Sequence, residues 1–199
     1  MKRLGILLSG RGSNFEAIAR NVVSGALDAE IALVLSNRPE ARGLEIAREQ
    51  GLPVLAIPSK GVAREEYDLS VVRELRERGV ELVCLAGFMR LLSAEFCRAF
   101  PQRILNIHPS LLPAFPGLDA QKQALEHGVK ITGCTVHFVD ELLDAGPIIL
   151  QAAVPVRDGD TEESLSARIL AEEHRIYSEA IHIVLGERWR IEGRRVLTS

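Results

Sequence analysis

The chain has few cysteines, no strong charge of either sign and no long apolar stretch. Its three cysteines are Cys84, Cys97 and Cys134, and none forms a C-x-x-C pair, so the sequence favours buried free thiols over a disulfide or a zinc site. A formal net charge of -3 over 199 residues provides no basic surface for nucleic acid. No apolar run approaches the roughly 20 residues needed to cross a bilayer, and we therefore expect a cytoplasmic protein.

Internal repeats and low-complexity tracts are also missing, and apolar runs instead alternate with segments of helical periodicity. The first half of the chain predicts strands at 2–9, 31–35, 53–57, 81–86 and 103–107, and helices at 15–23, 41–49, 64–78 and 93–99. Strands that alternate with helices predict an α/β fold of Rossmann-like character, in which helices flank a mostly parallel sheet.

The pattern changes after Pro109, because prolines at 109, 113 and 116 predict an extended loop before a helix at 120–126. Strands at 131–139 and 147–156 are separated by a loop too short for a helical crossover, which predicts an antiparallel pair late in the chain. Asp160 and Thr161 resemble a helix start, and a long helix at 165–183 is followed by a terminal hairpin at 189–197.

A glycine-bearing loop, Gly10-Arg11-Gly12-Ser13-Asn14, joins the first predicted strand to the first predicted helix. Backbone N–H groups at such a helix start bind anions, most readily a phosphate. A dinucleotide site would need a third glycine and an acid after the second strand, which ends Leu35-Ser36-Asn37, and a P-loop would need Gly-Lys-Ser/Thr. On the loop alone, a plain turn remains the alternative.

Asn106 and His108 end the fifth predicted strand and project from the same face, since side chains alternate along a strand. A fixed amide can donate to an oxyanion and a histidine can move a proton near neutral pH, so the pair suits acyl transfer. A carboxylate beside His108 would stabilise its imidazolium form. Asp140, Glu141 and Asp144 lie in one loop, and spacing alone leaves open which acid turns inward or whether all three are solvated.

Four segments together resemble the phosphoribosylglycinamide formyltransferases, a branch of the folate-dependent formyltransferase superfamily: SGRGSN at 9–14, LAGFMRLL at 85–92, NIHPSLLP at 106–113 and DAGP at 144–147. The resemblance covers nearly the whole chain. It implies formyl transfer from 10-formyltetrahydrofolate to the amine of glycinamide ribonucleotide, without a metal.

The resemblance also implies a role for individual residues. The catalytic residues would be Asn106, His108 and Asp144. The ribonucleotide would be bound by Gly12, Ser13, Asn14 and Glu173, with the first three at the phosphate and Glu173 near the ribose. Folate would be bound by Arg64, Met89, Arg90, Leu91, Leu92, Asn106, Asp140 and Asp144. His137 would support the site rather than react, and Asp119-Ala120-Gln121, where some relatives have histidines, receives no catalytic role.

We expect a single domain over residues 1–199, with a nucleotide-binding part over about 1–100, a catalytic and folate-binding part over about 85–185 and a hairpin over about 187–198. The same Asn, His and Asp would also serve a formyltetrahydrofolate hydrolase, and the glycine loop alone would serve a catalytically silent nucleotide-sensing module. A transfer-RNA formyltransferase is disfavoured because the chain has neither a C-terminal extension nor a basic surface. The sequence leaves open whether the protein is a monomer or a homodimer.

Overall fold

The computed structural model describes residues 1–198, and the chain divides into two compact units, Met1–Leu105 and Asn106–Ser199. Strand β5 (Ile104–His108) contains the point of division. Each unit has its own core and is described by itself.

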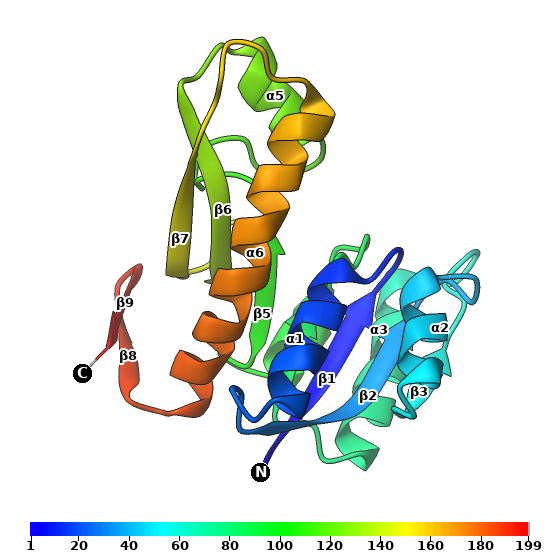
Figure 1. The fold of residues 1–199 in the computed structure, drawn as a ribbon. Helices are drawn as coiled ribbons and strands as arrows, with labels where there is room; N and C mark the ends of the chain where they lie inside the picture. Colours follow the sequence, from blue (N-terminus) through cyan, green and yellow to red (C-terminus); the bar gives the residue numbers. More distant parts are fainter. Residues whose placement is uncertain (199) are drawn as a thin grey trace. The chain divides into compact units, whose positions relative to one another are not determined.

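The first unit is a parallel sheet with the strand order β3-β2-β1-β4. Figure 1 shows α1 and α2 on one face of β1 and β2, and α3 on the opposite face. Burial of both faces explains why these strands are continuous apolar runs. The elements are β1 (Lys2–Leu8), α1 (Ser13–Val23), β2 (Ala29–Ser36), α2 (Arg42–Glu49), β3 (Val54–Ala56), α3 (Arg64–Glu77), β4 (Leu82–Leu85) and α4 (Ala94–Ala99).

The second unit contains the antiparallel strands that the sequence predicts. Strand β6 (Ile131–Phe138) pairs antiparallel with β7 (Ile148–Pro155), and the hairpin of β8 (Trp189–Glu192) and β9 (Arg195–Thr198) joins the edge of β7. Helix α5 (Ala120–Glu126) lies near the start of α6 (Glu162–Leu185), which runs along β6 and β7 (Figure 1). The mostly parallel α/β fold with late antiparallel strands is thus confirmed.

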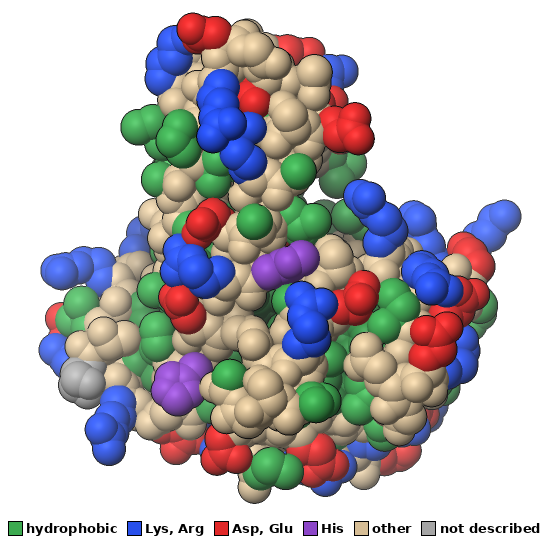
Figure 2. Space-filling view, viewed as in Figure 1, with side chains coloured by type: hydrophobic (Ala, Val, Ile, Leu, Met, Phe, Trp, Pro, Cys, Tyr) green, Lys and Arg blue, Asp and Glu red, His purple; other side chains and the backbone are tan. Residues whose placement is uncertain are grey.

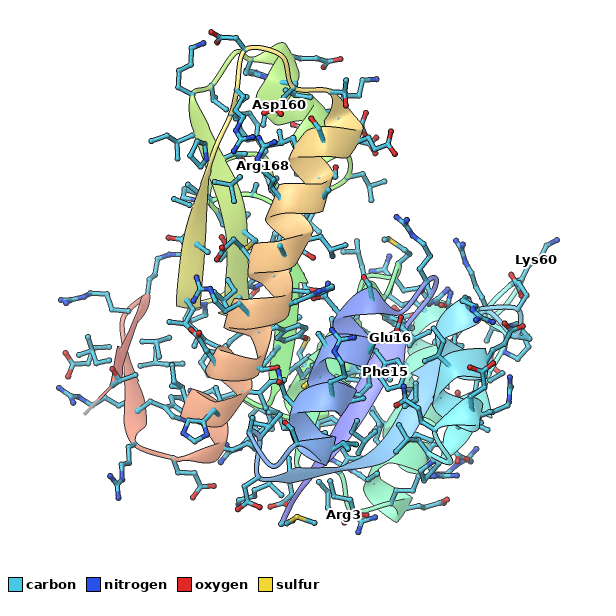
Figure 3. The ribbon with its side chains drawn as sticks, in the orientation of Figure 1. Arg3, Phe15, Glu16, Lys60, Asp160 and Arg168 are labelled. Atoms are coloured by element: carbon cyan, nitrogen blue, oxygen red, sulfur yellow. The ribbon has the colours of Figure 1, made fainter. Side chains whose placement is uncertain are left out.

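Helix α6 begins at Glu162, directly after the helix start that the sequence indicates at Asp160 and Thr161, and a capping box forms there. The Thr161 side chain accepts from the N–H of Ser164, and the Ser164 hydroxyl accepts from the N–H of Thr161. Arg168 reaches back to Asp160, where Nη1 donates to Oδ1 over 2.8 Å (Figure 3). This pair and the N–H of Arg157 lower the pKa of Asp160 below its usual range.

Helix α6 is the longest helix, with 24 residues, and its buried positions recur at helical spacing, as in Ile169, Glu173 and Ile176. Over residues 1–198 no helix is both long enough and apolar enough to cross a bilayer.

Gly133 on β6 faces the backbone of β7 so closely that a side chain there has no room. A Cβ would lie 1.9 Å from the carbonyl oxygen of Ala152. We expect Gly133→Ala to destabilise the second unit by about 1–3 kcal/mol, because the strands must separate. Urea unfolding followed by Trp189 fluorescence measures this loss. Gly159→Ala is the matched control, since a Cβ at Gly159 meets nothing within 4 Å, and equal stability of the two variants would contradict the prediction.

Candidate functional site

The glycine loop of the first unit has the geometry of an anion-binding turn. Gly12 caps α1 with a φ of 83°, in the left-handed region that favours glycine. A Cβ on Gly12 would lie 2.7 Å from the Cα of Gly43, whose N–H donates to the carbonyl oxygen of Gly10 over 3.0 Å. The helix therefore begins at Ser13, two residues before its predicted start at 15. Ser13 and Asn14 occupy its first turn, where N–H groups point out of the helix.

Residues 89–92 of the same unit follow β4 and combine exposed apolar side chains with a held arginine. Met89 and Leu91 are 61% and 51% exposed, whereas Leu92 is buried. The Arg90 guanidinium carbon lies 4.5 Å from the centroid of the Tyr67 ring. Arg64, the first residue of α3, is exposed and adds its charge to that of Arg90 near Asp68.

In the second unit, Asn106 and His108 lie on β5 two residues apart, so both side chains leave the same face of the strand. His108 is 5% exposed, and Asn106 is half-buried. The neighbouring polar group is His137 on β6, whose Nε2 lies 3.3 Å from Asn106 Nδ2. The pair is therefore part of one buried polar cluster.

Asp144 is the acid of the 140–144 loop that turns toward these histidines. Its Oδ2 lies 3.4 Å from His108 Nδ1, its Oδ1 lies 3.7 Å from His137 Nε2, and its side chain is 9% exposed. The N–H of Gly117 donates to Oδ2 over 2.9 Å. Asp140 is exposed and accepts from the N–H of Leu142 in a local turn. The structure thus shows that Asp144, and not Asp140, faces the histidines, a choice that sequence spacing left open.

Both ring nitrogens of His108 face groups that accept hydrogen bonds. Nε2 lies 2.8 Å from the carbonyl oxygen of Phe115, and Nδ1 faces the Asp144 carboxylate. A protonated imidazole, with two N–H donors, satisfies both partners at once, whereas a neutral ring satisfies only one. This arrangement therefore suits a histidine that contributes positive charge.

His137 has the opposite requirement. Its Nδ1 lies 2.8 Å from the carbonyl oxygen of Phe138, which can only accept, so Nδ1 carries the proton. Nε2 is then free of a proton and accepts from Asn106 Nδ2. Burial lowers the pKa of His137, against the opposing effects of the Phe138 carbonyl and the Asp144 charge. A neutral His137 fixes which end of the Asn106 amide faces β6.

Several groups that hold this cluster were missed by sequence reasoning. The hydroxyl of Thr135 donates to the carbonyl oxygen of Ser110 over 2.7 Å and accepts from the N–H of Leu112 over 3.0 Å, which secures the loop after β5. The other two groups, the Phe115 carbonyl and the Gly117 N–H, are backbone atoms, whose contacts no sequence motif predicts. Thr135 offered one signal, since it alternates with His137 on the same strand.

The binding roles of the other predicted site residues, Glu173, the glycine loop and residues 89–92, stay predictions. Glu173 is buried on α6, and its charge raises the pKa of Cys134 after the larger effect of that thiol's burial. The glycine loop and residues 89–92 belong to the first unit, whereas Glu173 and the β5 cluster belong to the second.

Charged side chains of both signs are interspersed over the face that Figure 2 shows, without a large area of one sign. Within residues 1–198 no group of three or more His, Cys, Asp or Glu side chains is arranged to hold a metal ion.

Comparison with known proteins gives concordant matches. A family model described as "Formyl transferase" matches residues 2–181. The chain is 42% identical over 187 residues to the phosphoribosylglycinamide formyltransferase of Bacillus subtilis, and the match covers 94% of this chain and 96% of the relative. It is 50% identical over 188 residues to the trifunctional purine biosynthetic protein adenosine-3 of Drosophila melanogaster, of which it spans only 14%.

Among solved structures, the chain is similar to glycinamide ribonucleotide transformylase 1 from Symbiobacterium toebii. The TM-score is 0.97 at 55% identity, and the match covers 100% of this chain and 94% of the other.

The lowered pKa of His137 predicts how stability depends on pH. The unfolded histidine takes up a proton below about 6.5 more readily than the folded one, so the free energy of unfolding should fall as the pH decreases from 7 toward 5. His137→Gln should flatten this dependence, as measured by urea unfolding at several pH values. His182→Gln, at an exposed position, is the control for losing a histidine, and parallel curves for wild type and His137→Gln would refute the prediction.

Proposed function

The chain belongs to the formyl transferase family, and we propose that it transfers the formyl group of 10-formyltetrahydrofolate to the amine of N1-(5-phosphoribosyl)glycinamide. The products are the N-formyl ribonucleotide and tetrahydrofolate, a step of purine biosynthesis. The observation that carries the proposal is the contact of Asp144 with His108, on the strand face that also presents Asn106. The matched relatives named for this activity support the choice of substrates.

In the proposed mechanism, the amine nitrogen attacks the formyl carbon and the carbonyl oxygen becomes an oxyanion. Asn106 Nδ2 carries two hydrogens. One is engaged by His137, so the second is available for the oxyanion. When the oxyanion collapses, the bond to the folate nitrogen breaks, and the proton lost by the attacking nitrogen moves to the leaving nitrogen, directly or through a water.

His108 supplies positive charge beside the developing oxyanion, and Asp144 maintains that charge. Because Nε2 of His108 donates to Phe115 and Nδ1 faces Asp144, direct proton donation to the substrate would require one of these partners to be exchanged. Electrostatic stabilisation requires no such exchange and is most effective in a site that excludes water.

The proposal keeps the binding roles that the family resemblance implies. In it, Gly12, Ser13 and Asn14 bind the substrate phosphate with N–H groups at the start of α1, and Glu173 binds near the ribose. The pteridine and the rest of the folate contact Arg64, Met89, Arg90, Leu91, Leu92, Asn106, Asp140 and Asp144. Exposed apolar side chains at Met89 and Leu91 suit a flat heterocycle. Both substrates are small molecules, and we place the reaction in the cytoplasm, with neither a nucleic acid nor a membrane partner.

Tetrahydrofolate release, followed by absorbance, tests the proposal. We expect release from 10-formyltetrahydrofolate to require the ribonucleotide and His108→Ala to lower kcat by at least about 100-fold, because the charge beside the oxyanion is lost. His182→Ala, at an exposed position, is the matched control. Equal release without the amine would indicate a hydrolase, and ribonucleotide binding without any release would indicate a sensing module.

Replacement of Asp144 separates chemistry from binding. Asp144→Asn keeps an oxygen that can accept from the N–H of Gly117 but removes the charge facing His108. We expect kcat to fall by about 100-fold or more while the KM for the ribonucleotide changes by less than about 3-fold. Glu141→Gln, an exposed change in the same loop, should leave kcat near that of the wild type. Near-normal turnover of Asp144→Asn would remove Asp144 from the mechanism.

A further inference from the structure

The segment 89–93 of the first unit is held from the protein interior at both ends and in the middle. Its exposed residues, Met89 and Leu91, are apolar. The contacts that hold its backbone come from buried polar residues, Ser9 directly after β1 and Asp68 on α3, which the proposed mechanism does not use.

Ser9 holds the first end of the segment. Asn37 Nδ2 donates to Ser59 Oγ over 3.2 Å, which leaves Asn37 Oδ1 as the acceptor for Ser9 Oγ at 2.6 Å. The Ser9 proton is thereby directed at Asn37, and its lone pair accepts from the N–H of Met89 over 2.8 Å. The N–H of Ser9 also donates to the carbonyl oxygen of Gly87 over 3.0 Å. Ser9 is only 2% exposed, and its hydroxyl therefore holds the backbone of Met89 from the protein interior.

Asp68 holds the second end. Its Oδ2 accepts from the N–H of Ser93 over 2.6 Å, and the residue is 1% exposed. Helix α4 does not need this contact for its cap, because the Ser93 hydroxyl accepts from the N–H of Phe96. Burial raises the pKa of Asp68, against the Ser93 contact and the charges of Arg90 and Arg64. Removing a carboxylate from water is unfavourable, so a buried carboxylate is expected where it makes a specific contact, here with the N–H of Ser93.

The middle of the segment rests on Tyr67, the neighbour of Asp68 on α3. The Tyr67 ring is 1% exposed and lies under the Arg90 guanidinium. Its hydroxyl has no hydrogen-bond partner within residues 1–198, so the ring contributes a surface for the cation rather than a polar contact. Arg90 is thus kept to one side while Met89 and Leu91 stay exposed.

We propose that Ser9 and Asp68 are positioning residues that fix segment 89–93 in the conformation that binds the pteridine ring of the formyl donor. The inference rests on the proposed function. Neither side chain needs to touch the substrate, because each acts through a backbone N–H of the segment. A segment that is already ordered loses less conformational entropy when the ligand binds, so loss of either contact weakens donor binding specifically.

The test compares Ser9→Ala, Asp68→Ala and Asp68→Asn with the wild-type chain. Calorimetry gives the dissociation constants of tetrahydrofolate and of the ribonucleotide, and steady-state kinetics give kcat and the KM for 10-formyltetrahydrofolate. We expect the two alanine variants to bind tetrahydrofolate about 10-fold more weakly, as for a lost buried acceptor. Ribonucleotide affinity and kcat at saturating donor should change by less than about 3-fold.

Asp68→Asn keeps an oxygen for the N–H of Ser93 and should restore most of the lost affinity. Leu69→Ala, an exposed change next to Asp68 on α3, is the control for a disturbed helix. Equal weakening of both ligands, equal loss in Asp68→Asn and Asp68→Ala, or unchanged tetrahydrofolate affinity would each overturn the inference.

If Asp68→Ala does not fold, as judged by circular dichroism, Ser9→Ala and Asp68→Asn decide the matter. Failure of this inference is distinct from failure of the proposed function. In the first case the wild-type chain still releases tetrahydrofolate only with the ribonucleotide, and in the second case it does not.

Discussion

The second unit is organised around one buried carboxylate. Asp144 is almost enclosed, and a carboxylate without donors in such a place would cost on the order of several kcal/mol. The Gly117 N–H and His108 Nδ1 both approach its Oδ2, so the loop after β5 and the loop after β6 must close on the same atom. Asp144 itself has a φ of 47°, in the left-handed region that few residues other than glycine adopt. Both loops therefore contribute atoms to the surroundings of this charge.

The two histidines beside Asp144 are assigned different states by their other partners. His108 has a carbonyl oxygen at its second nitrogen, so a proton on each nitrogen is satisfied. His137 has the Asn106 amide N–H 3.3 Å from its second nitrogen and the Asp144 carboxylate farther away at 3.7 Å, so a proton there would face the nearer donor. The geometry thus offers hydrogen-bond acceptors to both ring nitrogens of His108 but a donor to Nε2 of His137.

Much of this could be predicted from the sequence, because the information is periodic or local. The alternation of strands and helices follows from apolar spacing, the shared face of Asn106 and His108 follows from the period of a strand, and the start of α6 follows from Thr161 and Ser164. Spacing left the choice between Asp140 and Asp144 open and only the family resemblance selected Asp144, because the choice depends on how a loop closes on residues more than 25 positions away. No local pattern encodes the donors that select Asp144.

The same limit explains why the residues that position the loops escaped sequence reasoning in both units. Ser9, Asp68 and Thr135 are buried polar residues, and each contacts the backbone of a loop distant in sequence. Ser9 lies in the recognised segment 9–14, but nothing in that segment shows that its hydroxyl accepts from the N–H of Met89. Asp68 and Thr135 belong to no motif, and the partner of each is a backbone N–H, which every residue except proline possesses. The roles of such buried residues become visible only when their hydrogen-bond partners are known.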